Sequence, residues 1–355
     1  IAARDNLHMR RWDFVAAYLQ GSLLEDEVVY CRLPPGVESI GKDGKSRVCR
    51  VEKPIYGMAQ AGRRWQRTIF PWLKNYGLTQ AHGDNCVFTM CKTMQTPDGP
   101  RKERLFVGVY VDDCFVLSSH DDEYSLYHHF TTALQDAWDV EDEGPVNDLL
   151  NVEISRVGGS VILRQTAYIK KLLATYLEDG VIPASHQSCK TPCDESLPLA
   201  VAEALAQDAA DIDQVLLKKY QRLVGALLYC AVNTRPDVAY SVGYLCRAVG
   251  KPTDELYEAA LRVLYYPGRH SEVGLNYQGD DLAASGMTDS DWSVKHSTSG
   301  FVFRLSQAAI SWGSKRQPTV ALSSCEAELM AASEAAKEAA FLRDYLQELG
   351  VGDDS

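Results

Sequence analysis

Two adjacent carboxylates interrupt the most apolar part of the chain. Asp112 and Asp113 lie between residues 105–109 and 114–117, and both flanking runs have the composition of buried strands. An ionised Asp is rarely buried without compensation, and two side by side repel each other. A divalent cation would balance both charges if the backbone turned between the strands. The pattern therefore predicts a strand, a tight metal-binding turn and a second strand.

An ordinary hairpin with a polar tip is the competing interpretation of this segment. The length of the two apolar runs weakens it, and so does the lack of Gly or Asn at the tip, which two-residue hairpin turns favour. Taken by itself, the segment leaves both interpretations open.

The composition is that of an ordinary globular protein. The 355 residues are 46% hydrophobic and 24% charged, which permits two or three domains, and no apolar stretch reaches transmembrane length. The net charge of -12 argues against indiscriminate nucleic-acid binding. Ten cysteines are scattered without Cys-x-x-Cys spacing, and several lie in apolar runs. These features predict reduced thiols in an intracellular protein.

Positive charge is concentrated in one segment, where basic side chains alternate with aromatic ones. Such a mixture suits a surface that follows a nucleic-acid backbone, although a solvated charged face explains it equally well. The residues concerned are Arg47, Arg50, Lys53, Tyr56, Arg63, Arg64, Trp65 and Arg67.

Hydrophobic periodicity predicts the elements that position these side chains. A helix leading into a strand at 11–16 is expected within residues 1–20, a loop at 93–101 and a linker at 185–198. Further helices are expected at 60–76, 121–138, 167–177, 213–232, 239–249, 253–266 and 324–349. Further strands are expected at 28–33, 87–90, 105–110, 114–117, 149–154, 161–163, 285–287, 300–305 and 309–312.

A third carboxylate, Asp13, also lies within an apolar strand. A strand Asp together with an Asp pair at a turn is a ligand set for two metal ions held on a sheet. Two such ions can activate an attacking oxygen and stabilise a leaving one in phosphoryl transfer, and Mg²⁺ prefers carboxylates combined with substrate phosphates.

Seven blocks of residues occur in a fixed order over nearly the whole chain. They are 12–21 (WDFVAAYLQG), 53–61 (KPIYGMAQA), 110–113 (YVDD), 234–237 (TRPD), 288–292 (TDSDW), 297–300 (STSG) and 323–328 (SSCEAE). In these blocks the chain resembles the reverse transcriptase and RNase H region of a copia-type retrotransposon Pol polyprotein.

The resemblance implies an α+β fold. It comprises a right-hand polymerase palm with partial fingers, a helical thumb or connection, and an incomplete RNase H-like α/β domain. The expected segments are the fingers remnant and palm at 1–184, the linker and helical thumb or connection at 185–282, and the N-terminal part of the RNase H-like domain at 283–355.

The resemblance also implies the roles of individual residues at a polymerase site. Asp13, Asp112 and Asp113 would be the catalytic carboxylates and hold two Mg²⁺ ions, with Asp13 and Asp112 the most direct ligands. Tyr18 matches the steric gate that stacks under the incoming sugar and excludes a 2′-hydroxyl; a core tyrosine is the alternative.

Two further pairs of residues match blocks that contact nucleotide or nucleic acid. Gly57 and Gln60 would line the nucleotide pocket, where a Gly lets the backbone approach a base pair closely. Arg63 and Arg64 would contact a phosphate backbone.

In the last third of the chain, Asp289 and Glu328 match carboxylates of an RNase H site. Glu326 is the alternative to Glu328, but the two lie about 200° apart on a helix, and Ser323 with Glu326 forms a capping box. Because the chain ends soon after this helix, half of the expected ligands are missing and no RNA cleavage is expected.

The function implied is that of an RNA-directed DNA polymerase that uses an RNA template, a DNA primer and dNTPs. Integrase and protease segments of the same polyprotein would be its partners, away from membranes, in a cytoplasmic particle or the nucleus. Only twelve residues precede Asp13, so weak nucleotide binding is expected. The alternative is a catalytically inactive remnant that at most binds nucleic acid.

Overall fold

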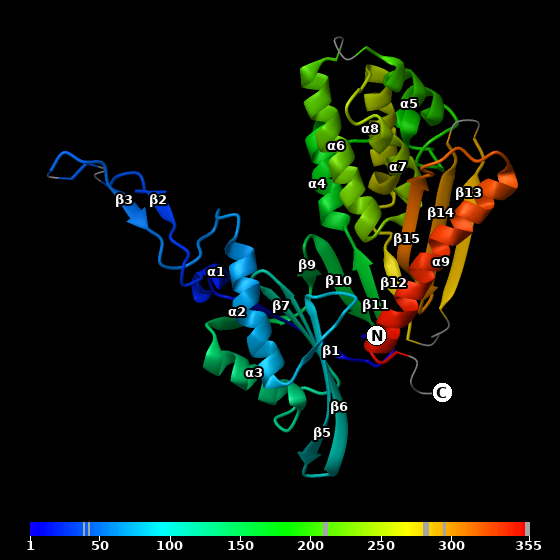
Figure 1. Cartoon of the computed structure of the whole chain (residues 1–355). Helices are drawn as coiled ribbons and strands as arrows, with labels where there is room; N and C mark the ends of the chain where they lie inside the picture. The colour runs from blue at the N-terminus through cyan, green and yellow to red at the C-terminus, as the bar shows by residue number, and fades with distance from the viewer. Residues whose placement is uncertain (38–39, 42, 209–211, 280–283, 294–295, 352–355) are drawn as a thin grey trace. The chain divides into compact units, whose positions relative to one another are not determined.

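The computed structural model describes the chain except residues 38–39, 42, 209–211, 280–283, 294–295 and 352–355 (Figure 1). The chain divides into two compact units. The N-terminal unit comprises Ala2, Leu7–Val146 and Asp344–Ser355; the C-terminal unit comprises Ile1, Ala3–Asn6 and Asn147–Arg343. This division follows packing, so the three functional segments expected from the sequence remain a prediction.

The N-terminal unit is built on a six-stranded antiparallel sheet with the order β4-β5-β6-β7-β1-β8. Its elements are β1 (His8–Phe14), α1 (Ala17–Gln20), β2 (Tyr30–Arg32), β3 (Val48–Arg50), α2 (Ala61–Tyr76), β4 (Thr79–Gln80), β5 (Val87–Thr96), β6 (Gly99–Tyr110), β7 (Asp113–Ser118), α3 (Leu126–Ala137) and β8 (Val140–Pro145).

One face of this sheet packs against α2 and α3 (Figure 1). The helix α2 contributes Trp65, Ile69 and Leu73, which recur every four residues and are fully buried. On β1 the buried side chains are Trp12 and Phe14. Since side chains alternate along a strand, the residue between them is directed to the opposite face of the sheet.

Two expectations for this unit were wrong. Residues 93–101 form no loop, because β5 and β6 pair without interruption from Val87 opposite Gly108 to Thr96 opposite Gly99. Their polar side chains obscure the strands, but the ladder pairs all of these residues except Pro97 and Asp98, which form the turn between β5 and β6. The helix expected to lead into the strand at 11–16 does not form: residues 2–6 are turns, β1 begins at His8 because it gains pairing partners on both sides, and the short α1 follows the strand.

The C-terminal unit combines a helical bundle with two small antiparallel sheets, ordered β12-β11-β10-β9 and β13-β14-β15. Its strands are β9 (Asp148–Leu149), β10 (Val152–Val157), β11 (Ser160–Arg164), β12 (Leu275–Tyr277), β13 (Ser285–Asp291), β14 (Thr298–Leu305) and β15 (Ala308–Arg316). Its helices are α4 (Thr166–Tyr176), η1 (Glu178–Gly180), η2 (Ala184–His186), α5 (Leu197–Ala206), α6 (Gln214–Asn233), η4 (Pro236–Val238), α7 (Ala239–Arg247), α8 (Asp254–Arg269) and most of α9 (Ser324–Glu348).

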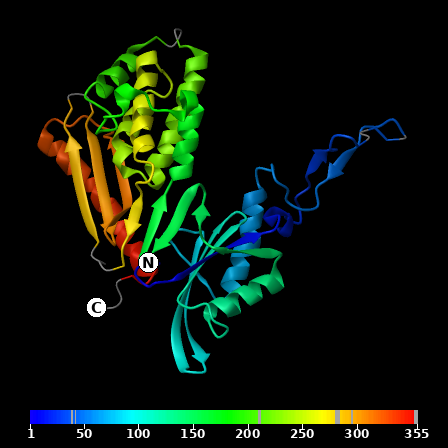
Figure 2. The same ribbon diagram turned by 180° about the vertical axis from the view of Figure 1, so that it is seen from behind.

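The helices α4 to α8 enclose the larger apolar core, and α9 runs behind the three-stranded sheet (Figure 2). The buried face of α9 consists of Ala327, Ala331 and Ala335, which allow the helix to lie close to its neighbours. The hydroxyl of Ser311 on β15 donates a 2.6 Å hydrogen bond to Glu338 of α9.

The block at residues 234–237 is a structural junction of this unit. The guanidinium of Arg235 is buried, donates to both carboxylate oxygens of Asp237 at 3.0 and 2.8 Å, and donates to the carbonyl of His270 at 3.0 Å. The hydroxyl of Thr234 donates to Gln165 Oε1 at 2.8 Å. The block therefore joins the ends of α6 and α8 to the start of α4.

Truncation of Asp237 tests this junction. Asp237→Ala leaves the buried Arg235 charge without its carboxylate, so we expect the free energy of unfolding to fall by about 3 kcal/mol. Glu334→Ala removes an exposed carboxylate paired with Lys337 and should cost less than about 0.5 kcal/mol. Urea unfolding followed by circular dichroism measures both free energies of unfolding. Equal losses in the two variants would show that the pair of Arg235 and Asp237 is not a structural junction.

Candidate active site

The Asp pair lies at a two-residue turn between β6 and β7. Tyr110 and Asp113 face each other across the ladder, which leaves Val111 and Asp112 at the tip. Val111 has a φ of 57°, a left-handed conformation that costs a β-branched residue energy. The buried Trp65 of α2 donates from Nε1 to the Val111 carbonyl at 2.5 Å. The predicted strand, tight turn and strand are confirmed, and α2 holds the turn.

The third carboxylate lies beside this turn. On β1, Asp13 is the direct register partner of Asp113 on β7, and the backbone N–H of Phe14 donates to the carbonyl of Asp112 at 2.8 Å. The sheet therefore brings Asp13, Asp112 and Asp113 together from segments about a hundred residues apart.

Negative charge is only partly compensated here. Burial raises the pKa of Asp13 above its ordinary value, and repulsion from Asp112, Glu143 and Asp113 raises it further. Arg11 acts in the opposite direction on Asp13. Its guanidinium lies 2.7 Å from Asp113 Oδ1 and 2.8 Å from Glu143 Oε2. Arg11 therefore pairs with the carboxylates of both Asp113 and Glu143.

Carboxylate oxygens held against mutual repulsion suit a hard divalent cation. In the part of the chain that the structure describes, no group of three His, Cys, Asp or Glu side chains is arranged to enclose an ion. Asp13 and Asp112 are the residues that could hold one, whereas the carboxylate of Asp113 is turned toward Arg11.

Tyr56 lies near the carboxylates, and Tyr18 packs against it. The rings of Tyr18 and Tyr56 lie 4.5 Å apart at 38°. Burial raises the pKa of Tyr56, and the nearby negative charge of Asp112 raises it further. Tyr56 was not among the predicted residues of the polymerase site; its place directly before Gly57 in a motif block was the available signal.

The residues that follow Tyr56 form the turns that lead into α2 and its first helical turn. Gly57 has a φ of 93° and open space where a side chain would project, so glycine is needed here for its backbone conformation. Arg63 is exposed to solvent. No contact in the structure tests their predicted roles in binding nucleotide or nucleic acid.

A second residue that the sequence analysis missed is Glu27. Its carboxylate accepts hydrogen bonds from Gln60 Nε2 at 2.9 Å and from Arg64 Nε at 2.7 Å. The side chains predicted to contact nucleotide and nucleic acid are thus held by one acid. Sequence gives little signal for this contact, since Glu27 precedes its partners by more than thirty residues.

The two carboxylates assigned to RNase H are both exposed. Asp289 lies on β13 opposite Gly300, and Glu328 lies in the second turn of α9. Glu326 instead caps α9, because its N–H donates to Ser323 Oγ at 3.2 Å and its carboxylate accepts from the Leu322 N–H at 2.6 Å. The capping role predicted for Glu326 is confirmed.

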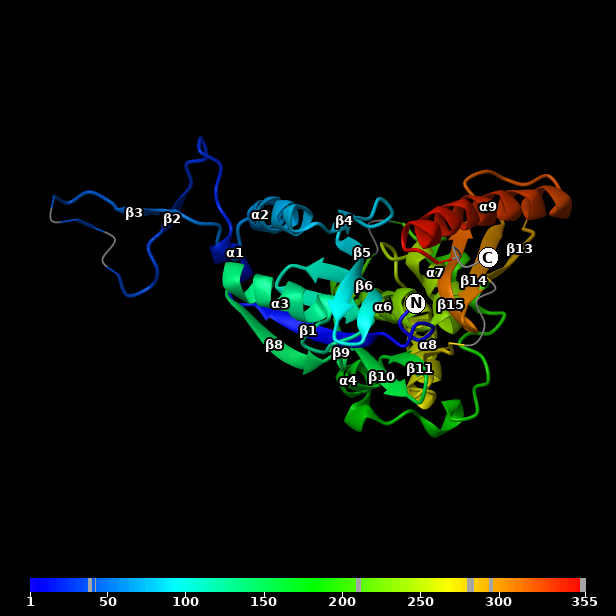
Figure 3. The same ribbon diagram turned by 90° about the horizontal axis from the view of Figure 1, so that it is seen from below.

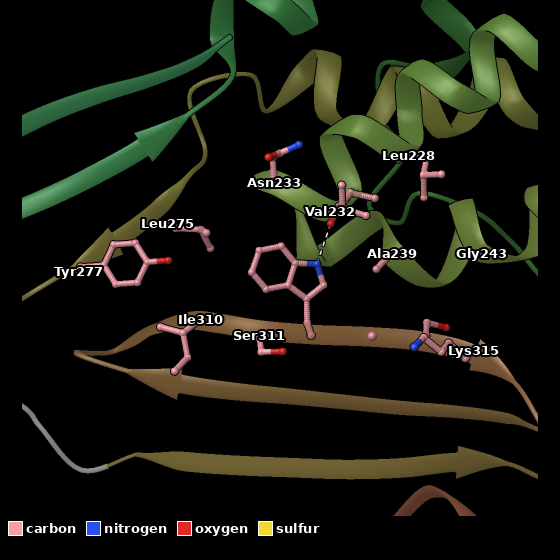
Figure 4. A pocket seen from close by; sticks show the side chains of 14 residues that line it. Leu228, Val232, Asn233, Ala239, Gly243, Leu275, Tyr277, Ile310, Ser311 and Lys315 are labelled. Carbon is pink, nitrogen blue, oxygen red and sulfur yellow. Dashed lines mark hydrogen bonds between the residues drawn. The ribbon is translucent and has the colours of Figure 1, made fainter. Parts of the chain in front are cut away.

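A cavity of about 480 Å³ lies in the C-terminal unit, between α6, α7, β12 and β15 (Figure 4). Trp312 of β15 lines it, and its indole Nε1 donates to the carbonyl of Ala231 at 2.6 Å. None of the described residues that line it belongs to the predicted sites. We regard it as a gap in the packing of helices on sheet.

Comparison with known proteins decides the family. Residues 1–184 match the model of the family described as reverse transcriptase (RNA-dependent DNA polymerase). The chain belongs to this reverse transcriptase family. The activity named in this family's description, RNA-dependent DNA polymerase, is the one that the motif blocks implied.

Relatives of this reverse transcriptase chain include transposon polyproteins. It is 31% identical to the retrovirus-related Pol polyprotein from transposon TNT 1-94 of Nicotiana tabacum, over 99% of the chain and 25% of that protein. It is 30% identical to the corresponding polyprotein from transposon RE1 of Arabidopsis thaliana, over 97% and 22%. The chain thus spans about a quarter of these plant relatives. The predicted resemblance to copia-type Pol polyproteins is confirmed.

A solved structure of a foamy viral protease-reverse transcriptase in complex with dsDNA matches 96% of the chain and 59% of its own, with 14% identity and a TM-score of 0.50. The predicted α+β polymerase-like fold is confirmed. Among the described residues, no helix has the length and apolar character needed to cross a membrane.

The acid that holds Gln60 and Arg64 yields a pH-dependent prediction. Hydrogen bonds from Arg64 and then Gln60 lower the pKa of Glu27 from 4.5 to about 2. Since the folded value is lower, Glu27 stabilises the fold above the ordinary pKa, and this contribution is lost as pH falls toward about 2. Glu27→Gln should therefore lower the urea midpoint at neutral pH, with a deficit that narrows on acidification.

The neighbouring exposed acid supplies the control for this series. Glu25→Gln should leave the urea midpoint unchanged at every pH. A Glu27→Gln deficit that stays constant on acidification would show that the ion pair is not its source.

Proposed function

We propose that Asp13, Asp112 and Asp113 form the active site of template-directed DNA synthesis, acting with two Mg²⁺ ions. The observation that carries this proposal is the register of β1 on β7, which places Asp13 beside the Asp112–Asp113 turn. The raised pKa of Asp13 supports it, because carboxylates that repel one another gain most from a shared cation.

Asp13 and Asp112 are the ligands that would hold Mg²⁺. When bound, the ions supply the positive charge that activates the primer 3′-hydroxyl and neutralises the departing pyrophosphate. The left-handed Val111 and its hydrogen bond from Trp65 fix the direction of the turn that carries Asp112. Arg11 keeps Asp113 oriented along the same edge.

The incoming dNTP would lie over the ring of Tyr18. This ring would exclude a 2′-hydroxyl, and its contact with Tyr56 supports its orientation. Gly57 and Gln60 would line the nucleotide pocket.

Arg63 and Arg64 would contact the nucleic-acid backbone. Arg63 is exposed and could contact a phosphate directly. Arg64 would either leave Glu27 to bind a phosphate or stay paired with Glu27 and position the neighbouring side chains. The partners proposed are an RNA template and a DNA primer; the dsDNA complex of the similar viral enzyme supports the DNA part.

The remaining assignments also rest on the family. Asp289 and Glu328 would be carboxylates of an RNase H-like domain. Integrase and protease segments of a Pol polyprotein would be partners, in a cytoplasmic particle or the nucleus.

An inactive remnant that binds nucleic acid is the second candidate. The ion pair between Arg11 and Asp113 favours it, because this contact occupies one of the three carboxylates.

Primer extension on poly-rA/oligo-dT with Mg²⁺ distinguishes the two candidates. Asp112→Asn should reduce extension on the order of 10³-fold, because it removes a ligand that contributes several kcal/mol to the transition state. Asp98→Asn, which removes the same charge at the turn between β5 and β6, should extend primers like the wild type. Equal extension by wild type and Asp112→Asn would rule out catalysis at this site and favour the inactive remnant.

A further inference from the structure

Two cysteines face each other in the segment between α1 and α2. The strands β2 and β3 pair antiparallel, and Cys31 on β2 is the direct register partner of Cys49 on β3. Figure 3 shows these strands projecting away from α1 and α2. Both thiols are free in the structure.

The register places the two cysteines close to the geometry of a disulfide. Residues directly opposite in an antiparallel pair have Cβ atoms about 4.5–5.5 Å apart, so the two strands would approach by up to about 1 Å to reach the roughly 3.5–4.5 Å of a disulfide. Their Cα separation, about 4.5–5.5 Å, falls inside the range of roughly 4.4–6.8 Å seen for disulfides. A hydrogen bond of 2.9 Å from the Val51 N–H to the Val29 carbonyl extends the pairing and fixes the register.

The two thiols also share one face of the hairpin. Cys31 and Cys49 are half-buried, whereas the residues beside them in each strand are exposed on the opposite face. The exposed neighbours are Tyr30, Arg32, Val48 and Arg50. The thiols are thus covered enough to stay aligned and open enough for a small reagent.

In the strand pairs that the structure describes, no other cysteine lies opposite a cysteine. Among the paired strands that the structure describes, Cys91 faces Arg104, and Cys114 faces Trp12 and Val109. Cys114 and Cys230 are fully buried, and burial raises the pKa of each thiol to about 12, which keeps it protonated.

We propose that Cys31 and Cys49 form a dithiol site that a small-molecule disulfide of the glutathione class oxidises. The thiolate of one cysteine attacks a sulfur of glutathione disulfide, forms a mixed disulfide and releases one glutathione thiolate. The second cysteine thiolate attacks the protein sulfur of that mixed disulfide and releases the other glutathione. Both cysteines are oxidised to one disulfide, and glutathione disulfide is reduced to two glutathione molecules, with the thiol protons passing to solvent or the departing thiolates.

The cross-link would fix a segment that leads directly into the site. The chain passes from Tyr18 through β2 and β3 to the block that begins at Lys53. A disulfide between Cys31 and Cys49 closes the intervening residues into a loop and removes the freedom of the two strands to separate. In a reducing compartment the strands stay unlinked.

The full chain treated with glutathione disulfide tests the proposal. Peptide mapping by mass spectrometry should show one linked peptide containing Cys31 and Cys49, and the count of free thiols should fall from ten to eight. Dithiothreitol should restore all ten. Cys49→Ser should instead trap glutathione on Cys31, and Cys31→Ser should trap it on Cys49.

Cys91→Ser is the matched control, because Cys91 is exposed and lies on β5 away from this hairpin; it should still give the linked peptide. Stable glutathione adducts on both Cys31 and Cys49, a link from either to another cysteine, or modification of Cys91 with both hairpin thiols unchanged would each overturn the proposal. Unchanged circular dichroism of the serine variants ensures that folded protein is compared.

Discussion

The crowding of three carboxylates at one edge of a sheet is the constraint on which the N-terminal unit depends. Asp13, Asp112 and Asp113 repel one another, and this repulsion opposes folding unless other contacts outweigh it. The apolar face of the sheet supplies those contacts, because a one-residue slip of β1 would expose Trp12 and Phe14 and bury Asp13. Burial of Trp12 and Phe14 therefore fixes a register that holds the three carboxylates together despite their repulsion.

Neighbouring groups hold this arrangement. Trp65 serves both core and site, since its ring packs on Phe14 at 4.9 Å while its N–H fixes the strained Val111 turn. Arg11 neutralises the carboxylate nearest to it, and Glu27 arranges the start of α2 in the same way. Each contact preorganises a side chain at some cost in strain or desolvation, a pattern common at functional sites.

Sequence predicted well what depends on local pattern. The strands around Asp112 and the capping role of Glu326 follow from runs and spacings within a few residues. The polar ladder of β5 and β6 has weak alternation and was mistaken for a loop. Helix α5 begins inside the expected linker, because Leu197 and its neighbours bury against α7 and α8. The pairing of Asp13 with Asp113 could not be predicted from spacing, since register between distant strands is set by tertiary packing.

Mn²⁺ binding measures whether these carboxylates share a divalent cation. Mn²⁺ takes the same oxygen ligands as Mg²⁺ and is detected by electron paramagnetic resonance. With a primer–template and dNTP present, the wild type should bind Mn²⁺ at least about tenfold more tightly than Asp13→Asn. Asp98→Asn should match the wild type. Equal Mn²⁺ affinity in wild type and Asp13→Asn would show that Asp13 does not hold the ion.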